Sequence, residues 1–507
     1  MCADSFSYAR HIMQTFNLSD YLLQYLDKSS ESPRNRQLYR LLRQAILDHV
    51  LPADTRLPSS RDLASELAIS RNTVLYAYEQ LLAEGYVEAR AGSGTFVADT
   101  VPDTVHLPAA LTRRPESDIA SIQLFLSKRG HRLVEQAGAA SQQWGAFVPG
   151  VPDVTQFPHK IWNTIQSKIW RKPPIAALTY GHGGGYQPLR EVVAEYLKVS
   201  RSVACEAGQV VITNGIHQSI DLCLRLLSDP GDVAWVEDPC YWGARNLLSA
   251  SGVTIRPIKV DAEGICPDAA DLAAVPRFIF VTPSHQYPLG MVMSLARRRS
   301  LLEYARQHNC WIIEDDYDSE FRYGGRPIAS LQGMDSSERV LYMGTFSKTM
   351  FPGLRLGYLV LPRLLSKPFV TGMEELHRSG QAPLQATMAE FMLQGHFNSH
   401  VRRMRLLYGA RLELLQQAIA SQFDAAEVHA VGSDAGLHLA LHLPERCDDK
   451  AIAKAAQVRG IAVRPLSNYY HDASTAKAGL VLGYACVEDS SIAPAFAILA
   501  DVVREYL

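Results

Sequence analysis

The 507-residue sequence lacks the patterns that mark stapled, secreted or membrane-spanning proteins. Its eight cysteines are scattered and no two form a CxxC pair, so neither a zinc site nor a disulfide framework is indicated. No basic region followed by an apolar stretch opens the chain, which starts "MCADSFSYAR". No apolar run approaches the ~20 residues needed to span a bilayer. These absences predict a cytoplasmic protein.

The chain also lacks an excess of charge of either sign. Its formal net charge is -2, so any nucleic-acid binding must come from a local patch rather than from bulk charge. Hydrophobic residues make up 47% and charged residues 20%, a composition that argues against general disorder. The length exceeds what a single core usually supports, so we expect two or more domains.

The order of patterns along the chain divides it into four parts. We predict a helical extension over 1–30, a compact unit over 31–98, a linker over 99–140 and a large domain over 141–507. In the last part, apolar runs such as "QVVITN" and "CWIIEDD" alternate with helical segments such as "HQSIDLCLRLLS". This alternation predicts an α/β fold with a parallel sheet covered on both faces.

The compact unit contains "LPSSRDLASELAISRNTVLYAYEQLLAEGYVEARAGSGTFVAD", which predicts a helix, a turn, a second helix and a hairpin. Ser59 or Ser60 can cap the first helix, Ser70 can cap the second, and Gly85 ends it. One face of the second helix is expected to be core, with Val74, Ala77, Tyr78, Leu81 and Leu82.

The other side of the second helix carries candidate DNA contacts. Arg71, Asn72 and Thr73 lie in its first turn, where a helix favours anions and where a recognition helix enters the major groove. Arg90 and the Gly92–Gly94 backbone belong to the hairpin, which could approach a sugar–phosphate strand. A small domain that binds protein is the alternative. Eight arginines against seven acids over 34–96 do not decide between them, but the order of the elements does.

This stretch resembles the winged helix-turn-helix of the GntR regulators, with their LPSxRxLA, SRxTVxxAYxxL and EGY…GsGTFV pattern. The resemblance implies binding to a double-stranded DNA operator. The implied DNA-contacting positions are Arg61, Ser70, Arg71, Asn72, Thr73 and Gly92. Ala91 stands where a basic wing-tip residue can occur, so a weaker wing contact is expected.

In the large domain, "GTFSKTMFPGLRLGYL" (344–359) carries a single lysine, Lys348. A lone lysine is usually solvated, and it becomes an imine nucleophile only when burial or nearby positive charge lowers its pKa. An apolar strand ending in acids, "CWIIEDDYDSEFRY", places Asp315 where α/β sheets bind ligands. Pyridoxal phosphate needs such an acid beside its ring nitrogen, and Tyr317 could donate to its phenolate oxygen.

Three further features suit the same cofactor. Thr345, Ser347 and Arg355 flank the lysine, and hydroxyls with an arginine fork suit a phosphate dianion. A helix N-terminus at Gly215–Ile216–His217 forms a second phosphate cradle. Tyr241 follows a strand and could stack on a flat ring.

The four features in this order resemble the class I aminotransferases of fold type I, from about Trp144 to the C-terminus. The resemblance implies a pyridoxal 5′-phosphate cofactor held as a Schiff base by Lys348, with Asp315 on the pyridine nitrogen and Tyr317 on O3′. The other implied roles are stacking by Tyr241 and phosphate binding by Arg355, Thr345 and Ser347. Tyr180, in "LTYGHGGGYQPLR", matches a tyrosine that reaches the neighbouring subunit's phosphate, which implies a dimer with shared sites.

The chain departs from the class I pattern at three places. "TPSHQYPLG" (282–290) stands where Asn-Pro-x-Gly is usual, so Ser284 and His285 are the candidates to replace the asparagine near O3′. Ile216 and His217 stand where many relatives have a hydroxyl or a glutamine. The late strand "GLVLGYA" lacks the arginine that binds the substrate carboxylate, and Arg464 in "IAVRPLSNYY" is the best substitute. A surface arginine at a strand end is the alternative reading of Arg464.

The two halves together resemble the MocR (GabR-like) regulators. The resemblance implies a dimeric, PLP-dependent transcriptional regulator whose DNA-binding domains swap head to tail. Either an amino compound that displaces Lys348 by aldimine exchange or PLP itself would be the signal. An active aminotransferase that has gained a DNA-binding module is the competing interpretation. The missing late-strand arginine and the DNA module favour sensing over turnover. A repressor that has lost PLP is disfavoured, because Lys348, Asp315 and Arg355 are present.

Overall fold

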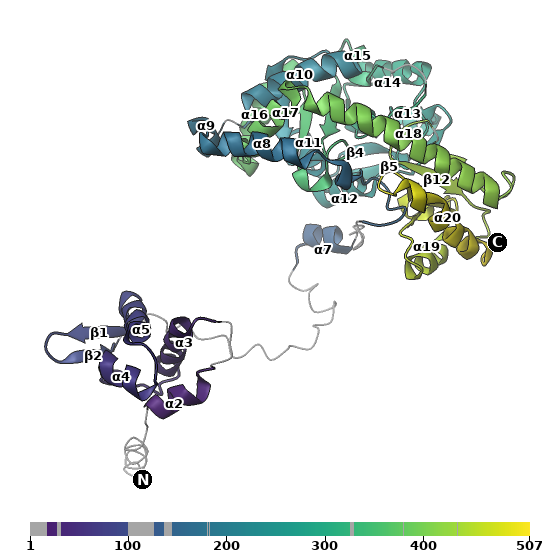
Figure 1. Ribbon diagram of the computed structural model, residues 1–507. Coiled ribbons are helices and arrows are strands. Elements are labelled where there is room, and N and C mark those ends of the chain that lie inside the picture. The colour runs from purple at the N-terminus through teal and green to yellow at the C-terminus, as the bar shows by residue number, and fades with distance from the viewer. Residues whose placement is uncertain are drawn as a thin grey trace, which may run out of the picture. The chain divides into compact units, whose positions relative to one another are not determined.

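The computed structural model describes residues 18–27, 32–99, 126–135, 144–179, 181, 183–324, 329–378, 380–432 and 434–507. The chain forms two compact units that divide between Ser121 and Ile122, and each is described by itself (Figure 1). Residue 30 and residue 140 lie outside the described residues, and the boundaries predicted at 30, 98 and 140 stay predictions. No helix in the described ranges has the length and apolarity required to cross a bilayer.

The first unit is a small helical core with a two-stranded wing. Its elements are α2 (Leu18–Tyr25), α3 (Arg34–Leu47), α4 (Ser60–Glu66), α5 (Arg71–Ala83), β1 (Val87–Arg90) and β2 (Gly94–Val97). Leu22 of α2, Leu38 and Leu42 of α3, Leu63 of α4 and Leu81 of α5 are all buried in one core. The predicted order of helix, turn, helix and hairpin is therefore confirmed.

Helices α4 and α5, the two helices of the predicted helix-turn-helix, begin where side-chain oxygens can accept from backbone N–H groups. Ser59 caps α4 by accepting from the N–H of Asp62, so it is Ser59 rather than Ser60 that does this. Ser70 caps α5 by accepting from the N–H of Thr73 at 3.2 Å. Gly85, with a φ of +79°, lies just past the end of α5.

The prediction for the buried face of α5 is right at four positions and wrong at one. Val74, Ala77, Tyr78 and Leu81 are buried, but Leu82 is 47% exposed. At 3.6 residues per turn, position 82 lies roughly 80° around the helix from Val74, beyond the stripe that α3 and α4 cover.

The second unit is built on an eight-stranded sheet with the order β3-β10-β9-β8-β7-β4-β5-β6. The strands are β3 (Val210–Thr213), β4 (Val233–Asp238), β5 (Thr254–Asp261), β6 (Gly264–Ile265), β7 (Phe278–Val281), β8 (Trp311–Asp316), β9 (Val340–Thr345) and β10 (Gly357–Val360). The apolar runs "QVVITN", "VAWVED", "RFIFVTP", "CWIIEDD" and "RVLYMG", all predicted as strands, correspond to β3, β4, β7, β8 and β9. Those of β4, β7, β8 and β9 pair in parallel with their neighbours, as does β5 with β4.

The predicted parallel sheet has two antiparallel exceptions: β10 pairs antiparallel with both β3 and β9, and the short edge strand β6 pairs antiparallel with β5. The chain returns directly after β9 through a compact turn, with Gly357 opposite Thr345, and no helix crosses over between them. A parallel partner would need such a crossover.

Helices cover both faces of this sheet, as predicted. The helices are α8 (His159–Arg171), α9 (Ile175–Leu178), α10 (Gln187–Arg201), α11 (Ile216–Leu227), α12 (Trp242–Ser251), α13 (Ala269–Ala273), α14 (Leu295–His308), α15 (Leu331–Met334), α16 (Arg363–His377) and α17 (Ala382–Leu393). Alternate strand residues point to opposite faces of the sheet. Val211 and Ile313 pack with α11, α12 and α16, whereas Ile212 packs with α8, α10 and α17, and Ile312 packs with α14.

A smaller antiparallel sheet follows, with the order β11-β12-β14-β13. Its strands are β11 (His429–Val431), β12 (His438–His442), β13 (Arg464–Pro465) and β14 (Gly479–Gly483), and its helices are α19 (Asp449–Val458) and α20 (Asp489–Arg504). The long helix α18 (His396–Gln422) links the two layers (Figure 1), because Phe397 packs under the large sheet while Leu412 packs under the small one. Short 3-10 turns occur at Val154–Gln156, Ala207–Gln209, Pro352–Leu354 and Leu466–Tyr469.

Within the predicted linker, the structure describes α7 (Lys128–Glu135), which contacts α12 of the second unit.

The difference between Leu81 and Leu82 gives a matched test of the first unit's core. Leu81→Ala should lower the free energy of unfolding of this unit by about 2–5 kcal/mol, because it leaves a cavity in a filled core. Leu82→Ala should change it by less than about 0.5 kcal/mol, because its side chain is largely solvated. Hydrogen exchange of the amides of 34–97 in the full chain measures both. Equal loss of protection in the two variants would contradict the assigned α5 face.

Candidate functional site

A cavity of about 540 Å³ opens at the C-terminal ends of β8 and β9 and the N-terminal ends of α11 and α12. It brings together most of the site residues predicted in the large domain. These are Ile216, His217, Tyr241, Asp315, Tyr317, Thr345, Ser347, Lys348, Arg355 and Arg464. Gly215 lies directly behind Arg355, as described below. Tyr180 lies outside the described residues, so its predicted role stays a prediction.

The Lys348 side chain is held by the main chain at the far side of the cavity. Its Nζ donates to the Gly150 carbonyl oxygen at 2.6 Å. Gly150 has a φ of +73°, a conformation that L side chains rarely adopt, and a Cβ there would lie 2.9 Å from Nζ. Burial lowers the pKa of the Lys348 amine, against the opposing charges of Asp318 and Asp315.

Three consecutive acids end β8. Because successive side chains of a strand point to opposite faces of the sheet, these acids have different neighbours. Glu314 accepts from the backbone N–H groups of Leu331 and Gln332, and Asp316 forms a buried ion pair with Arg201. Asp315, between them, faces the cavity instead. Its Oδ1 has no hydrogen-bond partner among the described residues. Burial, and then the charge of Asp316, raises the pKa of Asp315 to about 8.

The Arg201–Asp316 pair holds the turn behind the cavity. Arg201 Nε lies 2.7 Å from Asp316 Oδ2, and the hydroxyls of Tyr342 and Ser319 donate to the same oxygen. Arg201 also donates to Ser284 Oγ. This contact explains why Ser284, a candidate replacement for the class I asparagine, is not among the residues that line the cavity.

The other candidate, His285, does not line the cavity either. Its Nδ1 lies 2.9 Å from the hydroxyl of Tyr317, which does line the cavity. The residue of "TPSHQYPLG" that does line the cavity is Tyr287, which stands where Asn-Pro-x-Gly has its asparagine. The Tyr287 hydroxyl lies 3.2 Å from that of Tyr469. Sequence reasoning missed both tyrosines.

Tyr241 is anchored by a histidine. His217 Nε2 lies 2.8 Å from the Tyr241 hydroxyl. A Cβ on Gly243 would lie 2.5 Å from Tyr241 Cε1 and 2.6 Å from His217 Nε2, so only glycine lets the two rings meet over the start of α12. Burial, and then the nearby Arg355, lowers the pKa of His217, while burial raises the pKa of Tyr241. Both groups are therefore neutral near pH 7.

A positively polarised corner lies beside them. Arg355, with a φ of +49°, presents its guanidinium to Gly215, where a Cβ would lie 3.4 Å from Arg355 Nη2. Gly215 is the N-cap of the twelve-residue helix α11. The Thr345 hydroxyl accepts from the N–H of Ser347 at 3.1 Å on the neighbouring loop. A guanidinium and a helix N-terminus at one place suit an anion.

Arg464 also lines the cavity. It lies in β13, where it pairs with Val481 of the late strand β14, the strand that itself carries no arginine. Trp242, Tyr287 and Tyr469 are aromatic residues of the same cavity lining. The arginine is thus brought beside the position predicted for a carboxylate-binding group.

Sequence reasoning also missed Gly150, Trp242 and Arg245, which line the same cavity. Trp242 carries a signal that could have been read, because it directly follows Tyr241. Gly150 carries none, because its contact with Lys348 spans 198 residues of sequence.

The candidate DNA contacts of the first unit lie around the start of α5. Arg61, Arg71 and Asn72 are exposed, and Arg71 Nε donates to Ser60 Oγ at 3.3 Å. The hydroxyls of Ser70 and Thr73 lie 2.9 Å apart at the cap of α5. The two hydroxyls therefore hold the helix end, while the longer side chains extend into solvent.

In the wing, Arg90 is already paired. Its guanidinium lies 2.5 Å from Asp54 and 2.5 Å from Glu88, and it covers the ring of Phe96 at 4.5 Å. Gly92, with a φ of +73°, is exposed at the turn between β1 and β2. A phosphate contact by Arg90 would therefore compete with two carboxylates.

Two family models match the chain. "Aminotransferase class I and II" matches residues 175–479, and "Bacterial regulatory proteins, gntR family" matches residues 34–97. The probable rhizopine catabolism regulatory protein MocR of Rhizobium meliloti is 39% identical over 92% of this chain and 93% of its own. The pyridoxine biosynthesis transcriptional regulator PdxR of Corynebacterium glutamicum is 29% identical over 92% of this chain and 95% of its own.

Solved structures match the second unit's fold. An archaeal alanine:glyoxylate aminotransferase superposes with a TM-score of 0.70 at 26% identity, covering 76% of this chain and 99% of that one. The α-aminoadipate aminotransferase LysN of Thermus thermophilus superposes with a TM-score of 0.69 at 24% identity, covering 76% and 98%. The predicted fold class, a winged helix-turn-helix with a fold-type I aminotransferase domain, is confirmed.

The lowered pKa of Lys348 predicts reactivity at unusually low pH. Only a neutral amine is nucleophilic, and a pKa below the ordinary 10.5 means that the neutral form appears at lower pH. Reductive methylation with formaldehyde, read by peptide mass spectrometry, should modify Lys348 at a lower pH than Lys198. The latter is the internal control, because its hydrogen bond with Glu195 raises its pKa. The same pH profile for both lysines would contradict the argument.

Proposed function

The chain belongs to the GntR-type transcriptional regulators that carry a class I and II aminotransferase domain, and on that premise we propose that it senses an amino compound through pyridoxal phosphate held at Lys348. The aminotransferase fold implies dependence on pyridoxal phosphate, and the GntR domain implies binding to DNA. Relatives such as MocR and PdxR are named as regulators and not as enzymes, which supports a regulatory function for this chain.

The observation that carries the cofactor assignment is the unpartnered Asp315 Oδ1, buried beside an amine of lowered pKa. A protonated pyridine nitrogen is the kind of donor that this oxygen lacks, and it would keep the carboxylate ionised against the raised pKa. The corner formed by Arg355, Gly215 and the start of α11 suits the phosphate.

Pyridoxal phosphate, when bound, supplies an aldehyde carbon that amines attack reversibly. Lys348 would supply the resident amine, and burial lowers its pKa, which favours the neutral form that can exchange with another amine. Tyr241 would cover one ring face and Tyr317 would donate to the phenolate oxygen. Thr345 and Ser347 would add hydroxyl contacts to the phosphate.

An effector amine that displaces Lys348 also changes what the lysine contacts. Lys348 Nζ is bonded to the carbonyl of Gly150. That residue lies in the segment that follows the linker, and the same segment bonds the small sheet, where Ala146 accepts from Ala462 and Phe147 from Gly483. This gives the amine a direct connection to the chain that leads to the DNA-binding unit.

Aminotransferase turnover is the second candidate, favoured by the presence of Lys348 in the cavity of a domain whose fold matches solved aminotransferases. The dimer with exchanged DNA-binding domains and the contact from Tyr180 remain proposals drawn from the resemblance. The cytoplasmic location remains a proposal drawn from the absences in the sequence.

Operator recognition is tested at Arg71. Arg71→Ala should weaken specific DNA binding by about 1–3 kcal/mol if the side chain reads a base. Arg71→Lys is the matched control, since it keeps the charge but loses the two-pronged guanidinium, and it should lose nearly as much sequence discrimination. Gel shifts on a genomic operator and on a scrambled duplex, at fixed salt, measure both. Unchanged shifts for Arg71→Ala would remove it from the interface.

Effector recognition is tested at Arg464. Arg464→Ala should weaken binding of an amino acid effector about 10- to 100-fold, because a charge-assisted hydrogen bond to a carboxylate is lost. Binding of pyridoxal phosphate and of an amine without a carboxylate should stay within about twofold, since neither needs this guanidinium. Titrations that follow the visible absorbance of the cofactor provide the measurement. Loss of cofactor binding in this variant would instead assign Arg464 to the cofactor.

A further inference from the structure

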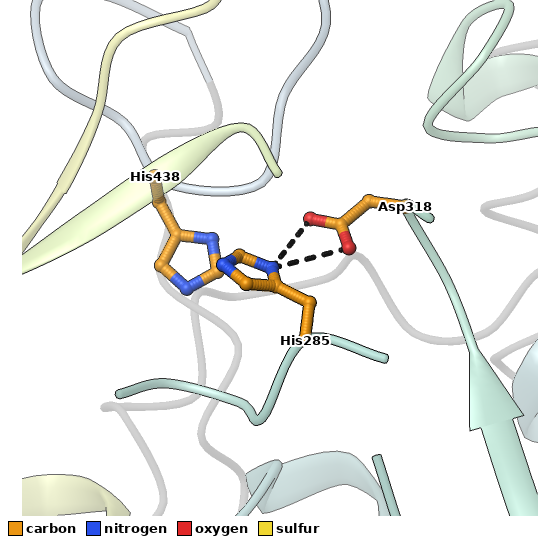
Figure 2. A group of neighbouring side chains, drawn as sticks. All are labelled: His285, Asp318 and His438. Atoms are coloured by element: carbon orange, nitrogen blue, oxygen red, sulfur yellow. Dashed lines mark hydrogen bonds and ion pairs between the residues drawn. The ribbon is translucent and has the colours of Figure 1, made fainter. Parts of the chain in front are cut away.

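Behind Tyr317, outside the cavity lining, three buried side chains from three separate elements meet (Figure 2). They are His285 from the loop after β7, Asp318 from the turn after β8, and His438 from β12. Each is at most 1% exposed. Gly436 closes over them, because a Cβ there would lie 2.1 Å from His285 Cε1 and 2.6 Å from Asp318 Oδ2.

One nitrogen of His285 has two neighbours. Its Nδ1 lies 2.9 Å from the Tyr317 hydroxyl, and 3.2 and 3.1 Å from the two carboxylate oxygens of Asp318. An ionised carboxylate only accepts hydrogen bonds, so a bare Nδ1 would set lone pair against lone pair in a dry site. A proton on His285 Nδ1 is the arrangement that avoids this repulsion and gives the carboxylate a donor.

This tautomer decides which way the tyrosine hydroxyl points. A protonated Nδ1 cannot accept from Tyr317, so the tyrosine oxygen accepts there and its own proton is left for the cavity that Tyr317 lines. We propose that His285 and Asp318 are positioning residues that hold the Tyr317 hydroxyl as a hydrogen-bond donor toward the cofactor's phenolate oxygen. The inference rests on the proposed function, because that oxygen belongs to pyridoxal phosphate.

The same three residues lie close enough to one another to hold a metal ion, but their existing bonds argue against it. Asp318 is engaged with His285 Nδ1, and His438 Nε2 lies 3.2 Å from the Pro288 carbonyl, to which its N–H donates. A cation on Asp318 would have to break the bond that orients His285. What remains is one unpartnered acceptor on each imidazole, His285 Nε2 and His438 Nδ1, among the described groups.

The tautomer can be measured without any cofactor. Full-length protein labelled with ¹⁵N-histidine should show a ring N–H on Nδ1 for His285, assigned by its loss in His285→Asn. A ring proton on Nε2 alone would overturn the proposal. So would a metal ion that co-purifies stoichiometrically and is lost in the same variant. This measurement holds even if pyridoxal phosphate does not bind, an outcome that would instead defeat the proposed function.

A double-mutant cycle on cofactor affinity tests the coupling. His285→Phe should weaken pyridoxal phosphate binding about 5- to 10-fold when Tyr317 is present, and by no more than about twofold in the Tyr317→Phe background. His285→Asn, whose amide N–H can replace the Nδ1–H, should stay within about twofold of the parent. If His285 only packs, His285→Phe should weaken cofactor binding equally with and without the Tyr317 hydroxyl, and His285→Asn should not restore it. Either result would overturn the proposal.

Asp318→Asn should behave as His285→Phe does, because an amide no longer requires the proton on Nδ1. Asp335→Asn is the charge-matched control, since that carboxylate accepts from the N–H groups of Arg339 and Val340 at the far end of β9. It should leave cofactor affinity unchanged. Full affinity in Asp318→Asn would overturn the role of Asp318.

Discussion

A buried carboxylate oxygen with no hydrogen-bond partner among the described residues is the constraint around which the site of the large unit is arranged. It belongs to Asp315, which is removed from water at the end of β8, next to a second acid and a lysine amine that is itself desolvated. Leaving such an oxygen unpaired costs stability, and a ligand that donates to it would recover that cost. The cavity, the cationic corner at Arg355 and the aromatic wall all surround this one unsatisfied oxygen.

In the first unit, the candidate DNA-contacting side chains are exposed to solvent, unlike the buried groups that line the cavity of the second unit. Arg61, Arg71 and Asn72 stand in solvent around the start of α5, where the capped helix end already favours an anion. Arg90 is held by Asp54 and Glu88, so the wing presents less free charge than its sequence suggests. Among the proposed DNA contacts, the exposed side chains at the start of α5 therefore have fewer competing partners than Arg90 of the wing.

Much of this structure could be predicted from local patterns in the sequence. Ser70 as a cap, the apolar runs of β8 and β9, and the grouping of Lys348 with Asp315 are all readable from neighbouring residues or from motif order. The errors arise where distant segments decide the outcome. Leu82 is exposed because α3 and α4 cover a narrower stripe than the helical pattern allows, and β10 runs antiparallel because a compact turn replaced a crossover. Gly150 carries no local signal, because its contact with Lys348 spans 198 residues of sequence. His285 was singled out by its motif, but its bonds with Tyr317 and Asp318 could not be read from that motif.

The three acids that end β8 alternate between the two faces of the strand. Which of them faces the cavity therefore depends on the number of residues that precede it in the strand, as well as on its chemistry. Deleting one residue upstream within β8 would turn Asp315 toward Arg201 and bring a neighbouring acid into the cavity, while every side chain type stayed the same. Over evolutionary time this strand should therefore accept point substitutions in its apolar part while its length stays constant. Changes of length are better accommodated in the loops that enter it.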